Sequence, residues 1–261
     1  INLGKTIYEP DTNIVSHRGF MDGGVENTLS AIEAAKEADA DLVEIDIQQT
    51  KDGGFVVYHD KTLSRLSGED DIIYDLTLNE LVTTTVLADG FSDTIASFEE
   101  VLEMSHDLNI KLLIELKTHG FETEDFLQRF VDLLDEYDAL DYHYVQSPDL
   151  PTMELLEELE PRVHTGHVYS IAYGKLPESN ADFISVEQSF ATKNIQQQVE
   201  DRDMELFVWT INDESDMQKF YEKNVNGVIT DHPDEALSIR EKFDEKQNFL
   251  QRILNKIKII Y

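Results

Sequence analysis

The chain has 261 residues, of which 41% are hydrophobic, so it can bury the core of one large α/β domain or of two small domains. It has no cysteine, which excludes disulfides, thiolate metal sites and a cysteine nucleophile. Its formal charge of −33 excludes nucleic-acid binding through a general basic surface, and an anionic substrate would need local positive charge from a metal ion or from a few Arg and Lys side chains.

Extended and helical segments alternate along most of the chain. The hydrophobic patterns predict strands at 13–17, 42–48, 111–117, 142–147, 163–168, 182–187, 205–211 and 227–231. Helices are predicted over about 28–38, 97–108, 124–137, 150–159, 192–202 and 213–223, and from 233 onward. Eight strands that alternate with helices over about 250 residues predict an α/β TIM (β/α)8 barrel, with a doubly wound sheet as the alternative. A glycine-rich dinucleotide motif does not open the first helix, which counts against a Rossmann site.

Three segments stand apart from this alternation. Residues 1–12 are predicted to be a lead-in to a barrel domain at 13–247. Residues 61–95 are predicted to form a small insertion after the hairpin of the second strand, irregular apart from a short helix at 77–82. Residues 248–261 form a basic amphipathic tail, which predicts either a last helix docked on the barrel wall or a weak membrane-surface helix.

The stretch at 41–60 predicts a strand, a tight turn and a returning strand. Alternation places Glu44 and Asp46 on one face of the outgoing strand, although that strand is otherwise built for burial. Asp52-Gly53 indicates a hairpin turn, and a two-residue loop there would place Asp46 opposite His59. The hairpin is therefore expected to bring a histidine beside two carboxylates.

Several polar residues lie at the predicted C-terminal ends of strands, where the active site of a TIM barrel is found. Glu44, Asp46 and Glu115 are hard oxygen ligands that suit Mg²⁺ or Ca²⁺. Arg18 and Lys117 are cations for an anionic substrate. His17 and His59 can serve as general acid and base. Together these groups predict phosphoryl transfer or phosphodiester cleavage.

Structural interpretations exist for each of these residues. The carboxylates could form ion pairs with the two cations, the two histidines could be hydrogen-bonded core residues, and Trp209 could simply fill the barrel. Gln146 could face the substrate or bond within the core, and Asp231 is expected to fix the last loop. His119 is expected to be a solvated loop residue.

These motifs together resemble the glycerophosphodiester phosphodiesterase family over about residues 13–235. The resemblance is carried by His17-Arg18-Gly19, Glu26-Asn27-Thr28, Glu44-x-Asp46, Thr50-Lys51-Asp52-Gly53, His59-Asp60, Glu115-x-Lys117, Trp209-Thr210-x-Asn212 and Thr230-Asp231-x-Pro233. One departure is Gln146-Ser147-Pro148, where the family often has Gln-Ser-Phe, so the leaving-group pocket is expected to differ.

The resemblance implies a TIM barrel that hydrolyses small glycerophosphodiesters to sn-glycerol 3-phosphate and an alcohol. It implies that His17 and His59 are the acid/base pair and that Arg18, Lys117 and Trp209 bind the substrate. It also implies that Glu44, Asp46 and Glu115 hold Mg²⁺ or Ca²⁺. The alternatives are a phospholipase C- or D-like enzyme acting on intact lipid and a non-catalytic binding protein on the same barrel.

The cellular setting is less constrained by the sequence. Apolar runs of the ~18–20 residues needed for a membrane span are absent, and a secretory signal does not open the chain. The first residue is Ile1 rather than Met, so we expect a processed form or a fragment. The resemblance then implies a bacterial protein that is cytoplasmic or membrane-associated, either through a missing upstream region or through the tail.

Overall fold

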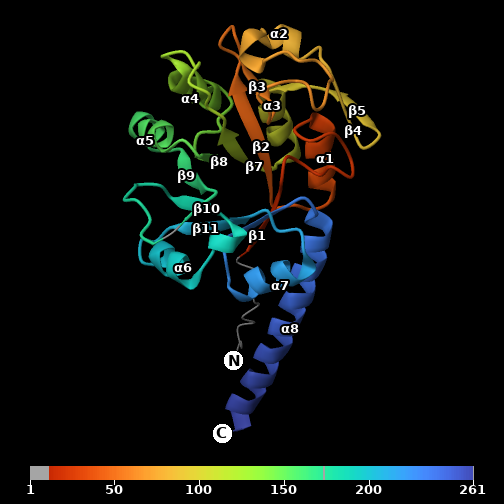
Figure 1. Cartoon of the computed structure of the whole chain (residues 1–261). Coiled ribbons are helices and arrows are strands. Elements are labelled where there is room, and N and C mark those ends of the chain that lie inside the picture. Colours follow the sequence, from red (N-terminus) through yellow and green to blue (C-terminus); the bar gives the residue numbers. More distant parts are fainter. Residues whose placement is uncertain (1–11, 173, 261) are drawn as a thin grey trace.

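The computed structural model describes residues 12–172 and 174–260, with the side chains of 248 and 250–260 excepted. At its centre is a closed ring of parallel strands (Figure 1). The strands are β1 (Asn13–Ser16), β2 (Leu42–Gln49), β7 (Lys111–Leu116), β8 (Tyr144–Ser147), β9 (His164–Tyr169), β10 (Phe183–Glu187), β11 (Glu205–Trp209) and β12 (Gly227–Thr230). Because β1 pairs with both β12 and β2, the ring closes, and the predicted TIM barrel is confirmed.

Helices follow most of these strands and cover the outside of the ring. They are α1 (Leu29–Glu37), α3 (Phe98–Leu108), α4 (Phe126–Glu136), α5 (Leu150–Leu159), α6 (Lys193–Glu200), α7 (Glu214–Glu222) and α8 (Pro233–Ile260). Several begin at side-chain caps that satisfy first-turn N–H groups. For example, Ser97 and Glu100 form a reciprocal capping box at the start of α3.

The inside of the ring is apolar towards its N-terminal end. Val15, Leu42, Leu113, Phe183, Phe207 and Ile229 form this inner cluster. Two glycines make room for its large rings: a Cβ on Gly166 would lie 2.3 Å from Phe183, and one on Gly227 would lie 2.2 Å from Phe207. Alternation along β2 then puts Glu44 and Asp46 on the same inner face as Leu42, further along the strand. The carboxylates on β2 therefore lie above this apolar cluster, towards the C-terminal ends of the strands.

The hairpin of β2 has a different register from the one predicted. Ile47 pairs with Val57, and Tyr58 N donates to Asp46 O, so Asp46 lies opposite Tyr58 and not opposite His59. The loop at 51–53 is one residue longer than predicted: it is closed by the bond from Thr50 N to Gly54 O, and Gly53 has φ +82°. A three-residue hairpin loop commonly places a glycine in this left-handed conformation. His59 still reaches the barrel mouth because β3 (Phe55–Val57) ends before it.

The segment between β3 and β6 (Ala96–Ser97) forms a small lobe beside the β2–β3 hairpin (Figure 1). It contains a 3-10 turn (Ile73–Asp75), α2 (Leu78–Leu81), β4 (Thr85–Ala88) and β5 (Phe91–Thr94). Its core includes Leu63, Leu66 and Ile73, and also Val25 from the β1–α1 loop. The β4–β5 hairpin was not predicted, although its two turn residues, Asp89 and Gly90, both have positive φ, as a type I′ turn requires.

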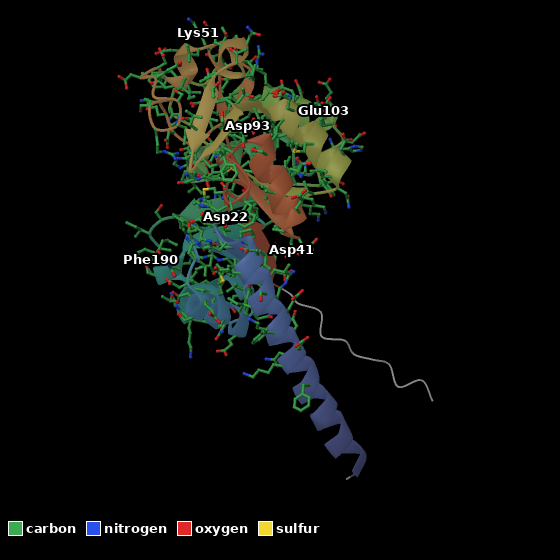
Figure 2. All side chains as sticks on the ribbon, turned by 90° about the vertical axis from the view of Figure 1, so that its right-hand side faces the viewer. Asp22, Asp41, Lys51, Asp93, Glu103 and Phe190 are labelled. Carbon is green, nitrogen blue, oxygen red and sulfur yellow. The ribbon has the colours of Figure 1, made fainter. Side chains whose placement is uncertain are left out.

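Acidic side chains are spread around the barrel in Figure 2, among them Asp22, Asp93 and Glu103, in line with the net charge of −33. Lys51, at the tip of the β2–β3 hairpin, lies at the opposite end of the molecule from the end of α8. Among the described residues, α8 and every other helix are too short or too polar to cross a membrane. The predicted apolar face of the tail falls on side chains outside the described ones, and nearly all of the predicted lead-in precedes the described residues, so membrane association remains a prediction.

Candidate active site

A cavity of about 270 Å³ opens at the C-terminal ends of the barrel strands. All of the site residues predicted from the sequence line it: His17, Arg18, Glu44, Asp46, His59, Glu115, Lys117 and Trp209. Gln146, Pro148, Val168, Ser170 and Ile229 complete the lining. The barrel therefore brings together side chains from strands that are far apart in the sequence.

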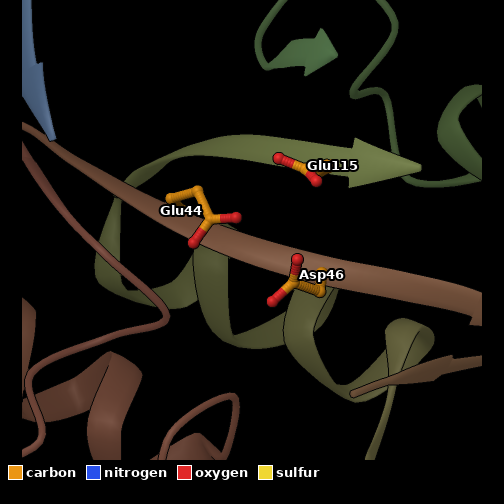
Figure 3. A group of neighbouring side chains, drawn as sticks. All are labelled: Glu44, Asp46 and Glu115. Atoms are coloured by element: carbon orange, nitrogen blue, oxygen red, sulfur yellow. The ribbon is translucent and has the colours of Figure 1, made fainter. Parts of the chain in front are cut away.

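Three carboxylates from neighbouring strands converge in this cavity (Figure 3). Glu44 and Asp46 lie on β2 and Glu115 lies opposite Asp46 on β7, so one oxygen from each falls within 4.8 Å of the others. Glu44, Asp46 and Glu115 are 3%, 1% and 9% exposed. Buried carboxylates at this spacing need compensating positive charge.

Two cations provide part of that compensation. Lys117 Nζ lies 3.0 Å from Asp46 Oδ1 and also bonds to Glu115, and Arg18 Nε lies 3.4 Å from Asp46 Oδ2. Burial would raise the pKa of Asp46, but the charges of Lys117 and Arg18 lower it overall. Burial and the charge of Asp46 together raise the pKa of Glu44 to about 8. The two cations thus pair with Asp46 and Glu115, and the raised pKa of Glu44 favours its protonated form until a further cation binds.

Neutral side chains orient the carboxylates. Asn27 Nδ2 donates to Asp46 Oδ2 (2.9 Å), and its Oδ1 accepts from Asp46 N (3.0 Å). Gln146 Nε2 donates to Glu115 Oε2 (3.0 Å) and is itself held by Ser185, whose hydroxyl donates to Gln146 Oε1 (2.6 Å). A set of oriented, buried carboxyl oxygens, one of which has no Arg or Lys partner among the described residues, fits a hard divalent cation.

Each histidine at the cavity donates to a carboxylate through Nδ1. The Nδ1 atom of His17 lies 2.6 Å from Asp231 Oδ1, and that of His59 lies 2.7 Å from Asp60 Oδ1. Burial would lower the pKa of His17, but the bond to Asp231 and the charge of Glu44 raise it overall. Both rings therefore keep Nε2 as the nitrogen available to a substrate, with a carboxylate as the partner of Nδ1.

Amide groups hold the segments that carry these pairs. Asn212 Nδ2 donates to Asp231 Oδ2 (2.6 Å). Gln48, which is 1% exposed, donates through Nε2 to Tyr58 O (2.6 Å) and to Asp60 O (2.9 Å), the carbonyls on either side of His59. His119 Nε2 donates in turn to Gln48 Oε1 (2.9 Å), so this half-buried histidine is part of the network that surrounds the site.

Sequence reasoning did not assign Asp60, Asp231 or Gln48 to the site. Asp60 follows His59 directly, and Gln48 continues the inward face of Glu44 and Asp46, so both could have been found from spacing. The contact between Asp231 and His17 joins the last strand of the barrel to the first, and only the closed ring places them together.

Comparison with known proteins agrees with this geometry. The sequence model of the glycerophosphoryl diester phosphodiesterase family matches residues 17–235. The chain is 26% identical over 242 residues to a glycerophosphodiester phosphodiesterase of Caldanaerobacter subterraneus, covering 88% of this chain and 98% of that protein. The crystal structure of a Thermotoga maritima glycerophosphodiester phosphodiesterase is 26% identical, with a TM-score of 0.68 and coverage of 87% and 98%.

An Oleispira antarctica phosphodiesterase, solved in complex with the product sn-glycerol-3-phosphate, has the same fold. Its TM-score is 0.79 at 24% identity, and the match covers 88% of this chain and 96% of that one. The match to the family model spans most of the barrel and includes every residue that lines the cavity. The chain belongs to the glycerophosphoryl diester phosphodiesterase family.

Proposed function

We propose that the protein hydrolyses glycerophosphodiesters to sn-glycerol 3-phosphate and an alcohol, with a divalent cation and a pair of histidines. The observation that carries this proposal is that one cavity is lined by three carboxylates, two cations and two histidines, each of which is hydrogen-bonded to a carboxylate through Nδ1. The names of the relatives and the product bound by the Oleispira enzyme support the substrate class.

Glu44, Asp46 and Glu115 would hold the cation, and their oxygen donors suit Mg²⁺ or Ca²⁺. When bound, this cation would neutralise charge on the phosphodiester. Gln146 and Asn27 keep two of the carboxylates in fixed orientations, so the donor set is preorganised.

Arg18 and Lys117 would contact the phosphate from the walls of the cavity. Both side chains are mostly buried, and acidic partners hold them in place, so little side-chain entropy is lost when an anion binds. Trp209 would form an apolar wall beside the glycerol. A cavity of about 270 Å³ has room for a glycerophosphate group and a small part of the leaving alcohol.

His17 and His59 would divide the proton transfers. One Nε2 takes a proton from the glycerol 2-hydroxyl or from a water molecule, and the other donates a proton to the leaving alcohol oxygen. The carboxylates of Asp231 and Asp60 hold each ring in the tautomer that has a lone pair on Nε2 in its neutral form.

A direct test measures release of sn-glycerol 3-phosphate from glycerophosphocholine, glycerophosphoglycerol and glycerophosphoethanolamine, with EDTA and with Mg²⁺ or Ca²⁺ restored. We expect release that EDTA abolishes and a cation restores. Release from none of these with metal present would reject the proposal, and faster turnover of lysophosphatidylcholine would favour the lipid-acting alternative.

Replacement of His17 or His59 by Ala should reduce kcat by about 10²- to 10⁴-fold, the usual contribution of a general acid or base. His106→Ala is the matched control, because the His106 side chain is exposed at the end of α3, with Nδ1 3.7 Å from Asp107 Oδ1. Near-normal turnover in either active-site variant would remove that histidine from the mechanism.

A further inference from the structure

Arg65, in the lobe that follows β3, joins two parts of the active site without lining the cavity. Its guanidinium makes three short hydrogen bonds. Nε donates to Asp60 Oδ2 (2.6 Å), Nη1 donates to Glu26 Oε2 (2.7 Å) and Nη2 donates to Glu26 Oε1 (2.7 Å). The pair with Glu26 is a bidentate fork, the geometry that Arg forms and Lys does not.

Both carboxylates that Arg65 holds have a second partner at the cavity. Asp60 accepts from His59 through its other oxygen (2.7 Å), and Glu26 accepts from Arg18 Nη1 (3.1 Å). A continuous chain of bonds therefore runs from His59 through Asp60, Arg65 and Glu26 to Arg18. It connects the group proposed for proton transfer with the group proposed for phosphate binding.

The backbone around Arg65 is fixed by burial. Leu63 and Leu66 are 0% and 5% exposed, and both pack in the core of the lobe together with Val25, the residue before Glu26. Leu66 O also accepts from Leu87 N (2.8 Å). The same apolar cluster thus sets the separation between Arg65 and Glu26.

An ordinary surface ion pair would have little effect, since exposed pairs contribute little to stability. The Arg65 side chain is 45% exposed, but Glu26 is only 10% exposed and its pKa is lowered. Burial would raise that pKa, and the bonds from Arg65 together with the charge of Arg18 lower it overall. Among the described residues, Glu26 would keep Arg18 as its one Arg or Lys partner without Arg65, and Asp60 would keep none.

We propose that Arg65 is a positioning residue of the phosphodiesterase site, through which the lobe fixes both His59 and Arg18. The expected loss of kcat rests on the proposed function, whereas the expected displacement of His59 and Arg18 does not. Removal of Arg65 frees Asp60 to turn away from His59 and frees Glu26 to turn away from Arg18, so the two groups no longer share one fixed geometry.

The kinetic test compares Arg65→Ala and Arg65→Lys with the wild-type protein and with Arg162→Ala. Arg162 is the matched control, because it also binds one glutamate through two nitrogens (Glu160, 2.9 and 2.8 Å) but lies in the loop before β9, away from the cavity. We expect Arg65→Ala to lower kcat by about 10- to 100-fold, as loss of an orienting partner commonly does. Arg65→Lys should recover part of the loss, and Arg162→Ala should retain wild-type kcat.

Chemical rescue separates positioning from a general loss of stability. Guanidinium added at concentrations below those that unfold the protein should restore part of the kcat of Arg65→Ala, and NaCl at the same ionic strength should not. A kcat of Arg65→Ala within twofold of wild type, or a loss that guanidinium does not relieve, would overturn the proposal.

A second readout does not depend on activity. In protein labelled with ¹⁵N-histidine, Arg65→Ala should shift the ring resonances of His59 and leave those of His143, on the outer wall of the barrel, in place. Unchanged His59 resonances would overturn the positioning role. If the wild-type protein releases no sn-glycerol 3-phosphate but His59 shifts, the proposed function fails and the positioning role stands.

Discussion

Replacement of Asp231 by Asn tests whether His17 acts through Nε2. In the native site the two carboxylate oxygens of Asp231 accept from different donors: one accepts from His17 Nδ1 and the other from Asn212 Nδ2, both at 2.6 Å. An Asn side chain has one acceptor oxygen and one donor NH₂, so it cannot accept from both partners.

Each orientation of the new amide damages the site. If its oxygen faces Asn212, its NH₂ faces His17 Nδ1, and the ring proton must move to Nε2. If its oxygen faces His17, two NH₂ groups face each other, and the charge that stabilises the protonated ring is lost in either case. A hydrogen bond to a charged group contributes about 1.5–3 kcal/mol, which corresponds to a fall in kcat of about 10- to 150-fold.

Steady-state release of sn-glycerol 3-phosphate gives kcat, and ¹⁵N shifts of the His17 ring show which nitrogen carries the proton. Asp182→Asn is the matched control: Asp182 also lies near a histidine, 3.6 Å from His164 Nδ1, but it precedes β10 at the other end of the barrel. A kcat for Asp231→Asn within twofold of wild type, with the protein folded, would refute the role given to the His17–Asp231 pair.

Two further predictions concern metal and pH. If Glu44, Asp46 and Glu115 hold a cation, Mg²⁺ or Ca²⁺ at 100-fold above its dissociation constant should stabilise the EDTA-treated protein by about 2.7 kcal/mol and raise its Tm in a thermal scan. The Tm of Glu115→Gln should not rise. The Tm of the exposed control Glu103→Gln should rise as in the wild type. Burial lowers the pKa of His143 to about 4 from the ordinary 6.5, so the unfolded chain binds a proton that the folded barrel does not. Stability from this residue is therefore full above pH 6.5 and falls by on the order of 3 kcal/mol as the pH drops to 4. The free energy of unfolding, measured with urea from pH 4 to 8, should depend less steeply on pH in His143→Gln, which keeps an acceptor for Leu112 N, than in the wild type. An equal pH dependence in both proteins would contradict the reasoning.

The barrel and most of its site could be predicted because the information is local. Alternation along β2 determines which side chains face inward, and parallel strands bring their C-terminal ends to one rim. Glu44, Asp46 and Glu115 followed from these two rules alone, and they meet in the structure. Residue type then indicated a hard cation and an anionic substrate.

The register of the β2–β3 hairpin could not be predicted from its turn residues, because Asp52-Gly53 fits a two-residue and a three-residue loop equally well. The longer loop is supported by contacts from outside the hairpin: Asp52 accepts from Leu78 N (2.9 Å), at the start of α2. The β4–β5 hairpin was missed for a related reason. Its strands are short and largely exposed, so they lack the apolar alternation that identifies a half-buried strand.

The partners of the two histidines show where local information ends. Asp60 is the next residue to His59, but Asp231 is 214 residues from His17 in sequence and meets it only because β12 pairs with β1. The same holds for Arg65, which lies 39 residues from Glu26 and reaches it through the apolar core of the lobe. Each histidine is thus oriented by a different part of the fold, one by the closure of the barrel and the other by the insertion. A substitution that loosens the lobe should therefore disturb His59 and Arg18 and leave the His17–Asp231 pair intact, whereas one that weakens the β1–β12 contact should do the reverse.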